Sequence, residues 1–161
     1  MVKSVYDEIL EKRNVTFEKW ENAYNLVKSE VKDLISSFNE IRKIPNPQFQ
    51  TLTLNFYSIH LCNYFYFHVR KLLVDKNNGQ EVSKLLTNGF SNVSSTPSPT
   101  VMNDILSYLI VDDKERIISL KDEYKKIYEL RNKYAHGASS ETNYSITFDE
   151  YKKIFDDISK I

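Results

Sequence analysis

The sequence predicts an all-α protein, an up-and-down four-helix bundle that forms a single domain over residues 1–161. Three observations support this fold class. Apolar residues recur at three- and four-residue spacing along most of the chain, which is typical of amphipathic helices. Residues that break helices are few, with 3 glycines and 4 prolines. One long polar connection separates the second and third long helices, and 161 residues are enough to bury one core.

The first two long helices are separated by prolines. The apolar spacing predicts a helix from about Thr16 to Arg42, and residues 3–13 form a short helix before it or an earlier part of it. The segment "IPNP" then breaks the chain, because each proline disfavours helical geometry in the residue before it. The second helix, from Pro47 or Thr51 to Val74, is apolar on nearly every side, so we expect it at the centre of the bundle.

Residues 75–99 form the polar connection, with one or two helical turns expected around Glu81 to Leu86. Helix resumes after Pro99. It continues as far as Ala135 or His136, with a bend or break expected near residues 111–113.

A last helix follows the segment "TNYSIT". Its start has the spacing of a capping box. The Thr147 side chain is expected to accept a hydrogen bond from the Glu150 backbone N–H, and the Glu150 side chain to return one.

Composition excludes several classes of function. The 22 Lys+Arg residues balance 22 Asp+Glu residues, so the chain has no general attraction for nucleic acid or anionic membranes, and a polyanion must be bound locally. No apolar run approaches the roughly 20 residues of a membrane span, and the start lacks the layout of a signal peptide. These features predict a cytoplasmic protein without a membrane partner. Cys62 is the only cysteine, which excludes a disulfide or thiolate metal cluster within one chain and favours a place in the core.

The segment "ELRNKYAHGASS", residues 129–140, interrupts a regular helical pattern. Arg131 occupies the next position of an apolar stripe that contains Ile117, Leu120, Tyr124 and Ile127. A guanidinium at such a position is partly desolvated, which is costly unless it is paired or faces a cleft or a partner surface. Arg131 is therefore a candidate for a binding or catalytic role.

Asn132 and His136 are four residues apart, so they share a helix face and Asn132 can orient the imidazole. Arg131 and His136 are about 140° apart around an ideal helix. Two arrangements can bring them together. Either the last turn unwinds, which Gly137 would permit, or the two side chains converge where a second copy of the helix meets the first.

An Arg, a His and an Asn without a carboxylate or metal cluster suit the cleavage of RNA. The ribose 2′-OH is an internal nucleophile, so the protein has to supply only a proton-transfer group and a cation for the phosphate. His136 fits the first role, because the ordinary pKa of histidine lies near neutrality. Arg131 fits the second role, because its planar fork binds two phosphate oxygens. This chemistry requires no cofactor and no metal.

The segment "RNKYAHG" resembles the signature of the HEPN superfamily (higher eukaryote and prokaryote nucleotide-binding): an Arg, four to six residues, then a His, with Asn favoured directly after the Arg. Arg131, Asn132 and His136 match it position by position. The resemblance implies an up-and-down four-helix bundle with the motif near the end of a late helix. It also implies a metal-independent endoribonuclease that acts as a homodimer with one composite site. Similar proteins serve in toxin–antitoxin, abortive-infection and other antiviral systems, where an antitoxin or a regulatory protein is a further partner.

Two features of the resemblance leave alternatives open. HEPN toxins that are silenced by a nucleotidyltransferase antitoxin are similar to one another in a Tyr two residues after the His, and this chain has Ala138 there. The superfamily also contains non-catalytic members, so the alternative function is a helical module that binds a nucleotide or a protein partner.

Four further residues complete the list of candidates. Lys133 and Tyr128 lie near the motif and are candidates for contacts with RNA. His60 and His68 lie on the apolar second helix, where no carboxylate has the spacing of a metal ligand. We therefore interpret these two histidines as core or bundle-lining residues.

Overall fold

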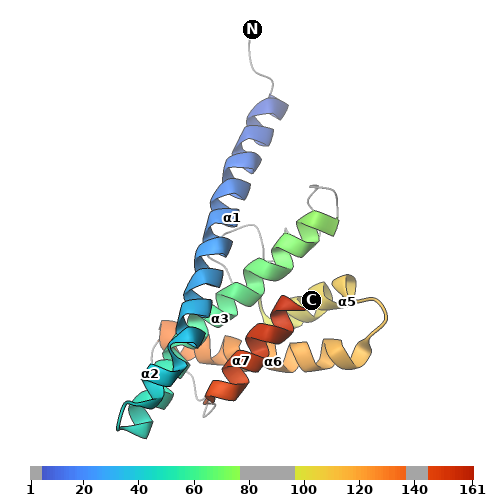
Figure 1. Ribbon diagram of the computed structural model, residues 1–161. Coiled ribbons are helices and arrows are strands. Elements are labelled where there is room, and N and C mark those ends of the chain that lie inside the picture. Colours follow the sequence, from blue (N-terminus) through green and yellow to red (C-terminus); the bar gives the residue numbers. More distant parts are fainter. Residues whose placement is uncertain (1–4, 77–96, 137–144) are drawn as a thin grey trace.

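The computed structural model describes residues 5–76, 97–136 and 145–161, and the side chains of residues 21–73, 97–134 and 145–161. These residues form helices and no strand, which confirms the all-α prediction (Figure 1). The helices are α1 (Val5–Ser36), α2 (Phe38–Arg42), α3 (Pro47–Lys76), α5 (Pro99–Leu109), α6 (Lys114–His136) and α7 (Phe148–Ser159). The turns expected around residues 81–86, and Gly137, lie outside the described residues.

The first predicted helix is longer than expected and is interrupted once. It begins at Val5, so the early residues belong to the same helix, and it ends at Ser36 before the short α2. At the junction, the Ser37 hydroxyl donates to the Asp33 carbonyl at 2.9 Å. A serine that bonds to its own helix backbone competes with the regular ladder and often bends a helix.

Helix α3 lies at the centre of the molecule, as its apolar composition predicts. It begins at Pro47 because the Asn46 side chain accepts from the Gln48 backbone N–H at 3.0 Å and caps the first turn. It packs against α1, α5, α6 and α7. Its fully buried residues include Leu61, Cys62, Tyr64, Phe65 and Val69.

The break expected near residues 111–113 is a reversal of the chain. Helix α5 is capped by Ser98, whose side chain accepts from the Val101 backbone N–H at 3.3 Å. It ends at Leu109, and Ile110 is extended. Helix α6 then runs back along α5, and the two pack as a hairpin on one side of α3 (Figure 1).

Helix α7 begins as predicted, but only half of the expected capping box forms. The Thr147 hydroxyl accepts from the Glu150 backbone N–H at 3.2 Å. The Glu150 carboxylate does not return the bond; instead it pairs with Lys126 of α6. An ion pair that ties two helices together thus replaces a local contact.

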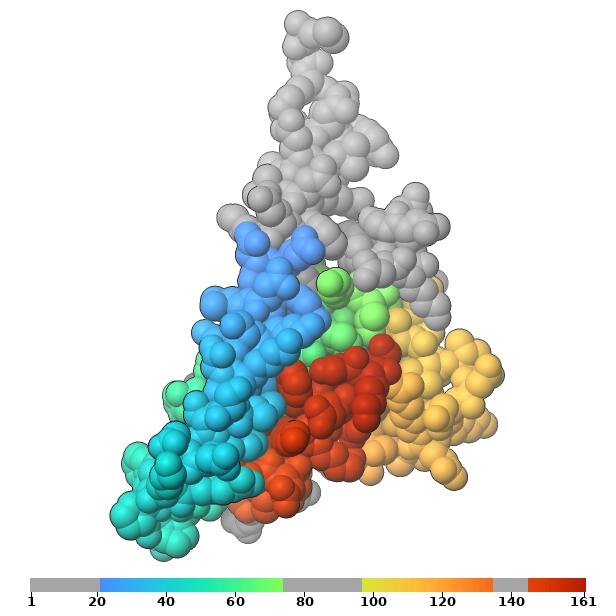
Figure 2. All heavy atoms as spheres, viewed as in Figure 1, coloured from blue at the N-terminus to red at the C-terminus, as the bar shows by residue number. Residues whose placement is uncertain are grey.

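On the face shown in Figure 2, α7 fills the space between α1 and the α5–α6 hairpin. The Tyr151 hydroxyl of α7 donates to the Tyr57 carbonyl of α3 at 3.0 Å, which joins α7 to the central helix. Within the described ranges, no helix combines the length and the apolar character that crossing a membrane requires.

Candidate functional site

Helix α6 carries the motif, and its packing positions Arg131. Its buried face consists of Leu120, Tyr124, Ile127 and Leu130. Arg131 comes directly after the last of these and is half-buried, at the edge of the core. The partly desolvated guanidinium expected from the sequence is therefore present.

Arg131 and Asn132 are hydrogen-bonded neighbours. Arg131 Nη1 donates to Asn132 Oδ1 at 2.9 Å, in a half-buried setting. Among the residues that the structure describes, no carboxylate pairs with Arg131. The bond fixes one side of the guanidinium fork and leaves its other N–H groups available to an anion.

The Arg131 charge also acts on the core beside it. Burial raises the pKa of the Cys62 thiol to about 12, and the nearby Arg131 guanidinium opposes that rise. Burial likewise raises the pKa of the Tyr124 hydroxyl, again against the effect of Arg131. The Tyr124 hydroxyl donates to the Pro97 carbonyl at 2.6 Å. Cys62 is a buried, protonated core residue, in line with the prediction, and it supplies no nucleophile.

The other motif residues are placed as follows. The backbone of α6 is helical through His136, so positions 131 and 136 are about 140° apart around the axis. The His136 side chain lies outside the described residues. Lys133 is half-buried, and the Tyr128 ring lies 5.8 Å from the Tyr124 ring, between centroids. The structure thus brings Arg131 and Asn132 into direct contact.

A contact that the sequence did not indicate joins the end of α6 to α3. The rings of Phe56 and Tyr134 meet edge-on, with centroids 6.3 Å apart and an interplanar angle of 82°. Tyr134 lies one helical turn after Arg131. Phe56 is nevertheless 50% exposed, so this aromatic pair forms part of the surface next to the motif.

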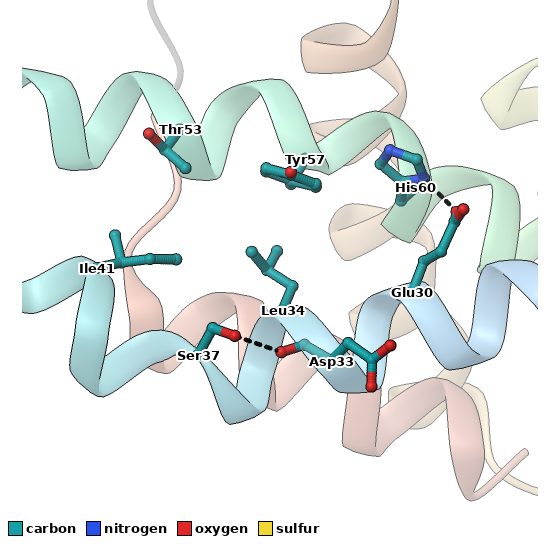
Figure 3. Close-up of a pocket in the computed structure, with 8 residues that line it drawn as sticks. All are labelled: Glu30, Asp33, Leu34, Ser37, Ile41, Thr53, Tyr57 and His60. Carbon is teal, nitrogen blue, oxygen red and sulfur yellow. Dashed lines mark hydrogen bonds and ion pairs between the residues drawn. The ribbon is translucent and has the colours of Figure 1, made fainter.

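A cleft of about 530 Å³ lies between α1 and α3 (Figure 3). Glu30 of α1 pairs with His60 of α3, with the carboxylate oxygen 3.0 Å from Nδ1, at one end of the cleft. Asp33 supplies a second carboxylate. Two carboxylates repel phosphate, so this cleft is a poor place for an RNA backbone.

His60 and His68 both bond to α1, as expected of bundle-lining residues. His68 Nδ1 lies 2.9 Å from the Tyr24 hydroxyl, and its ring packs near the Tyr24 and Tyr64 rings. Burial, aided by the charges of Lys28 and Lys71, lowers the pKa of His68 to about 4. His68 is therefore neutral at physiological pH. In the part of the chain that the structure describes, no three His, Cys, Asp or Glu side chains are placed to hold a metal ion.

A charged cluster joins α6 to α7 on another side of the molecule. Lys153 Nζ lies 2.7 Å from Glu123 Oε1 and 2.6 Å from Asp157 Oδ2. Glu123 Oε2 is buried without a hydrogen-bond partner. Burial, together with the neighbouring Asp157 carboxylate, raises the pKa of Glu123 to about 7. This cluster is a structural link between helices that the sequence pattern did not single out.

Comparison with known families gives one match. The profile of RiboL-PSP-HEPN matches residues 16–161, which is nearly the whole chain and includes all of α6 and α7. The chain belongs to the RiboL-PSP-HEPN family. No curated protein and no solved structure matches it. Membership in a HEPN family confirms the resemblance found in "RNKYAHG" and indicates a helical module of ribonuclease-like or nucleotide-binding type.

Proposed function

We propose that this HEPN protein is a metal-independent endoribonuclease of the toxin or antiviral-defence type. The observation that carries the proposal is the state of Arg131. This guanidinium is half-buried beside the core, is held by Asn132, and has no carboxylate partner among the described residues. A cation kept in such a place at a cost in desolvation is suited to an anionic ligand.

The proposed reaction is cleavage of RNA by its own 2′-OH. The 2′ oxygen forms a bond to the adjacent phosphorus, and the bond from phosphorus to the 5′ oxygen breaks. The products carry a 2′,3′-cyclic phosphate and a 5′-OH. Arg131 binds the non-bridging phosphate oxygens, where charge develops. His136 is the proton-transfer group, either accepting the 2′-OH proton or protonating the leaving 5′ oxygen.

Asn132 has two parts in this proposal. Its side-chain oxygen holds Arg131 Nη1 at 2.9 Å, and its amide N–H group is a donor of the kind that can orient the His136 imidazole. Lys133 and Tyr128, on the same helix, are proposed to contact the RNA chain around the cleaved phosphate.

The proposed site is a composite of two copies of the chain. Because α6 is helical through His136, unwinding before that residue does not bring positions 131 and 136 to one side. A symmetric pair of α6 ends supplies both groups twice within one cleft. This supports the second of the two arrangements considered from the sequence.

RNA cleavage in excess EDTA tests the proposal. Wild type is expected to cleave a mixed-sequence RNA and to leave cyclic phosphate ends, and His136→Ala is expected to lose at least 100-fold in rate, a typical contribution of a positioned acid or base. His60→Ala is the matched control, because His60 pairs with Glu30 in the cleft between α1 and α3. Equal cleavage by wild type and His136→Ala would favour the non-catalytic module that binds a nucleotide or a protein. Loss of activity in EDTA would overturn the metal-free mechanism.

A further inference from the structure

The first turns of α3 carry apolar side chains that remain on the surface. Phe49, Leu52 and Phe56 are 52%, 52% and 50% exposed. Half-buried Ile59 and Asn63 continue the same line, and we call these five residues the α3 stripe. Their separations of three, four, three and four residues are those of the a and d positions in a coiled-coil seam. The α3 stripe therefore has the pattern of a surface that packs against another helix.

The chemistry of this segment favours a protein partner. From Ile44 to Val69 the sequence has no Asp, Glu, Lys or Arg. Cores of protein interfaces are depleted in charged residues and enriched in aromatic ones, as this segment is. Contacts with RNA or an anionic membrane need Lys or Arg beside the apolar residues, and the segment has neither.

The position of the α3 stripe favours a second copy of this chain. Phe56 is the central residue of the α3 stripe, and its ring meets that of Tyr134, one turn from Arg131. If a two-fold axis passes near Phe56, the residues around Phe56 in one copy lie near the same residues of the other copy. Both α6 ends then lie at the same interface. Helix α3 is also free to approach another molecule here, because its first turns project with α2 beyond the other helices (Figure 1).

We propose that two copies dock through their α3 stripes, with the helices antiparallel and Phe56 at the two-fold axis. Residues equally far from Phe56 then oppose each other, so Phe49 of one copy meets Asn63 of the other. An apolar seam of this kind associates by removing its half-exposed side chains from water. The inference rests on the proposed function in one respect: it places the composite site beside this interface.

Light scattering on the full chain is the first test. At tens of micromolar, wild type is expected to have a mass of about 38 kDa, twice the 19.0 kDa of one chain. Leu52→Glu buries a charge in the seam and is expected to give a monomer. Ile118→Glu is the matched control, since Ile118 is a 60% exposed apolar residue on α6, and it should stay dimeric. A monomeric wild type, or a dimeric Leu52→Glu, would overturn the proposal.

Disulfide cross-linking tests the axis itself. Phe56→Cys is expected to form a covalent dimer under mild oxidation, because a residue at a two-fold axis meets its own copy within the few ångströms that a disulfide spans. Leu26→Cys, at a position of α1 that is 61% exposed, is expected to remain uncrosslinked. Cys62 is fully buried and adds no reactive thiol. Cross-linking of Leu26→Cys as fast as Phe56→Cys would contradict the assigned axis.

Cleavage assays on the same variants separate this inference from the proposed function. If Leu52→Glu is monomeric and inactive while Ile118→Glu is dimeric and active, the docking surface and the ribonuclease function are both supported. A dimer that cross-links through Phe56 but never cleaves RNA keeps the docking surface and removes the ribonuclease. A monomeric Leu52→Glu that cleaves as fast as wild type keeps the ribonuclease and overturns a composite site at this interface.

Discussion

The apolar side chains of α3 have different surroundings in its first turns and in its second half. In the second half, Cys62, Phe65 and Val69 are 0% exposed. In the first half, Phe49, Leu52 and Phe56 are each about half exposed, at 52%, 52% and 50%. Helices α1, α5, α6 and α7 together cover α3, yet they leave the apolar face of its first turns open.

This difference shows that the apolar sequence of a helix does not identify the surface that packs against it. The second half of α3 is covered by its own chain and stabilises the fold. In the first half, the face that carries Phe49, Leu52 and Phe56 is left uncovered beside the motif, and we have proposed that a second copy covers it. Substitutions in the two halves should therefore affect different properties: stability in one case, association and activity in the other.

The largest expected effect on stability is in the covered half. The Phe65 ring is fully buried and meets the Tyr124 ring edge-on at 5.0 Å between centroids. Phe65→Ala leaves a cavity and should lower the free energy of unfolding by about 3–5 kcal/mol. Phe56→Ala, the matched substitution on the exposed face of the first turns, should lower the free energy of unfolding by roughly 1 kcal/mol or less. Urea denaturation at a concentration low enough to keep the chain monomeric measures both, and equal losses would remove the contrast.

An intermediate effect is expected from pH. The pKa of His68, in the covered half of α3, is lowered from 6.5 to about 4, chiefly by burial. Between pH 6.5 and about 4, the unfolded chain therefore binds more protons than the folded chain. His68 thus makes the stability of the fold decrease as the pH falls through this range. His68→Gln should flatten that fall, measured as the melting temperature between pH 4 and 6.5.

Glu123 provides a control of opposite sign. Its pKa is raised from 4.5 to about 7, first by burial and then by the neighbouring Asp157 carboxylate. Between pH 4.5 and about 7, the folded chain therefore binds more protons than the unfolded chain. Glu123 thus makes the stability of the fold decrease as the pH rises through this range. Glu123→Gln should remove this loss at neutral pH. If His68→Gln and Glu123→Gln changed the pH dependence of stability in the same direction, burial would not be the main cause of the two pKa shifts.

The smallest expected effect on stability is at the motif. Arg131 is half-buried and has no carboxylate partner among the described residues, so Arg131→Met should leave the melting temperature unchanged or raise it. The same variant should lose RNA cleavage. Arg131→Lys should be largely inactive as well, because a point charge does not reproduce a two-point grip on phosphate. A fall of many degrees in Arg131→Met would instead identify Arg131 as a structural residue.

The sequence by itself determined where α3, α5 and α7 begin. Asn46 before Pro47, Ser98 before Pro99 and Thr147 before Phe148 each cap a helix through groups two or three residues away. Such contacts are local, so a pattern in the chain is sufficient to specify them. The central place of α3 followed from its apolar surface, and the partly buried position of Arg131 followed from helical spacing along α6.

Only the tertiary structure decided which groups meet across helices. Glu150 pairs with Lys126 of α6 instead of completing its own cap, and His68 bonds to Tyr24 of α1. These partners lie 24 and 44 residues apart, and no local pattern ranks them above others. The same holds for the α3 stripe. Because α3 is apolar on nearly every side, its composition cannot show which face the other helices cover, and only their packing leaves Phe49, Leu52 and Phe56 at the surface.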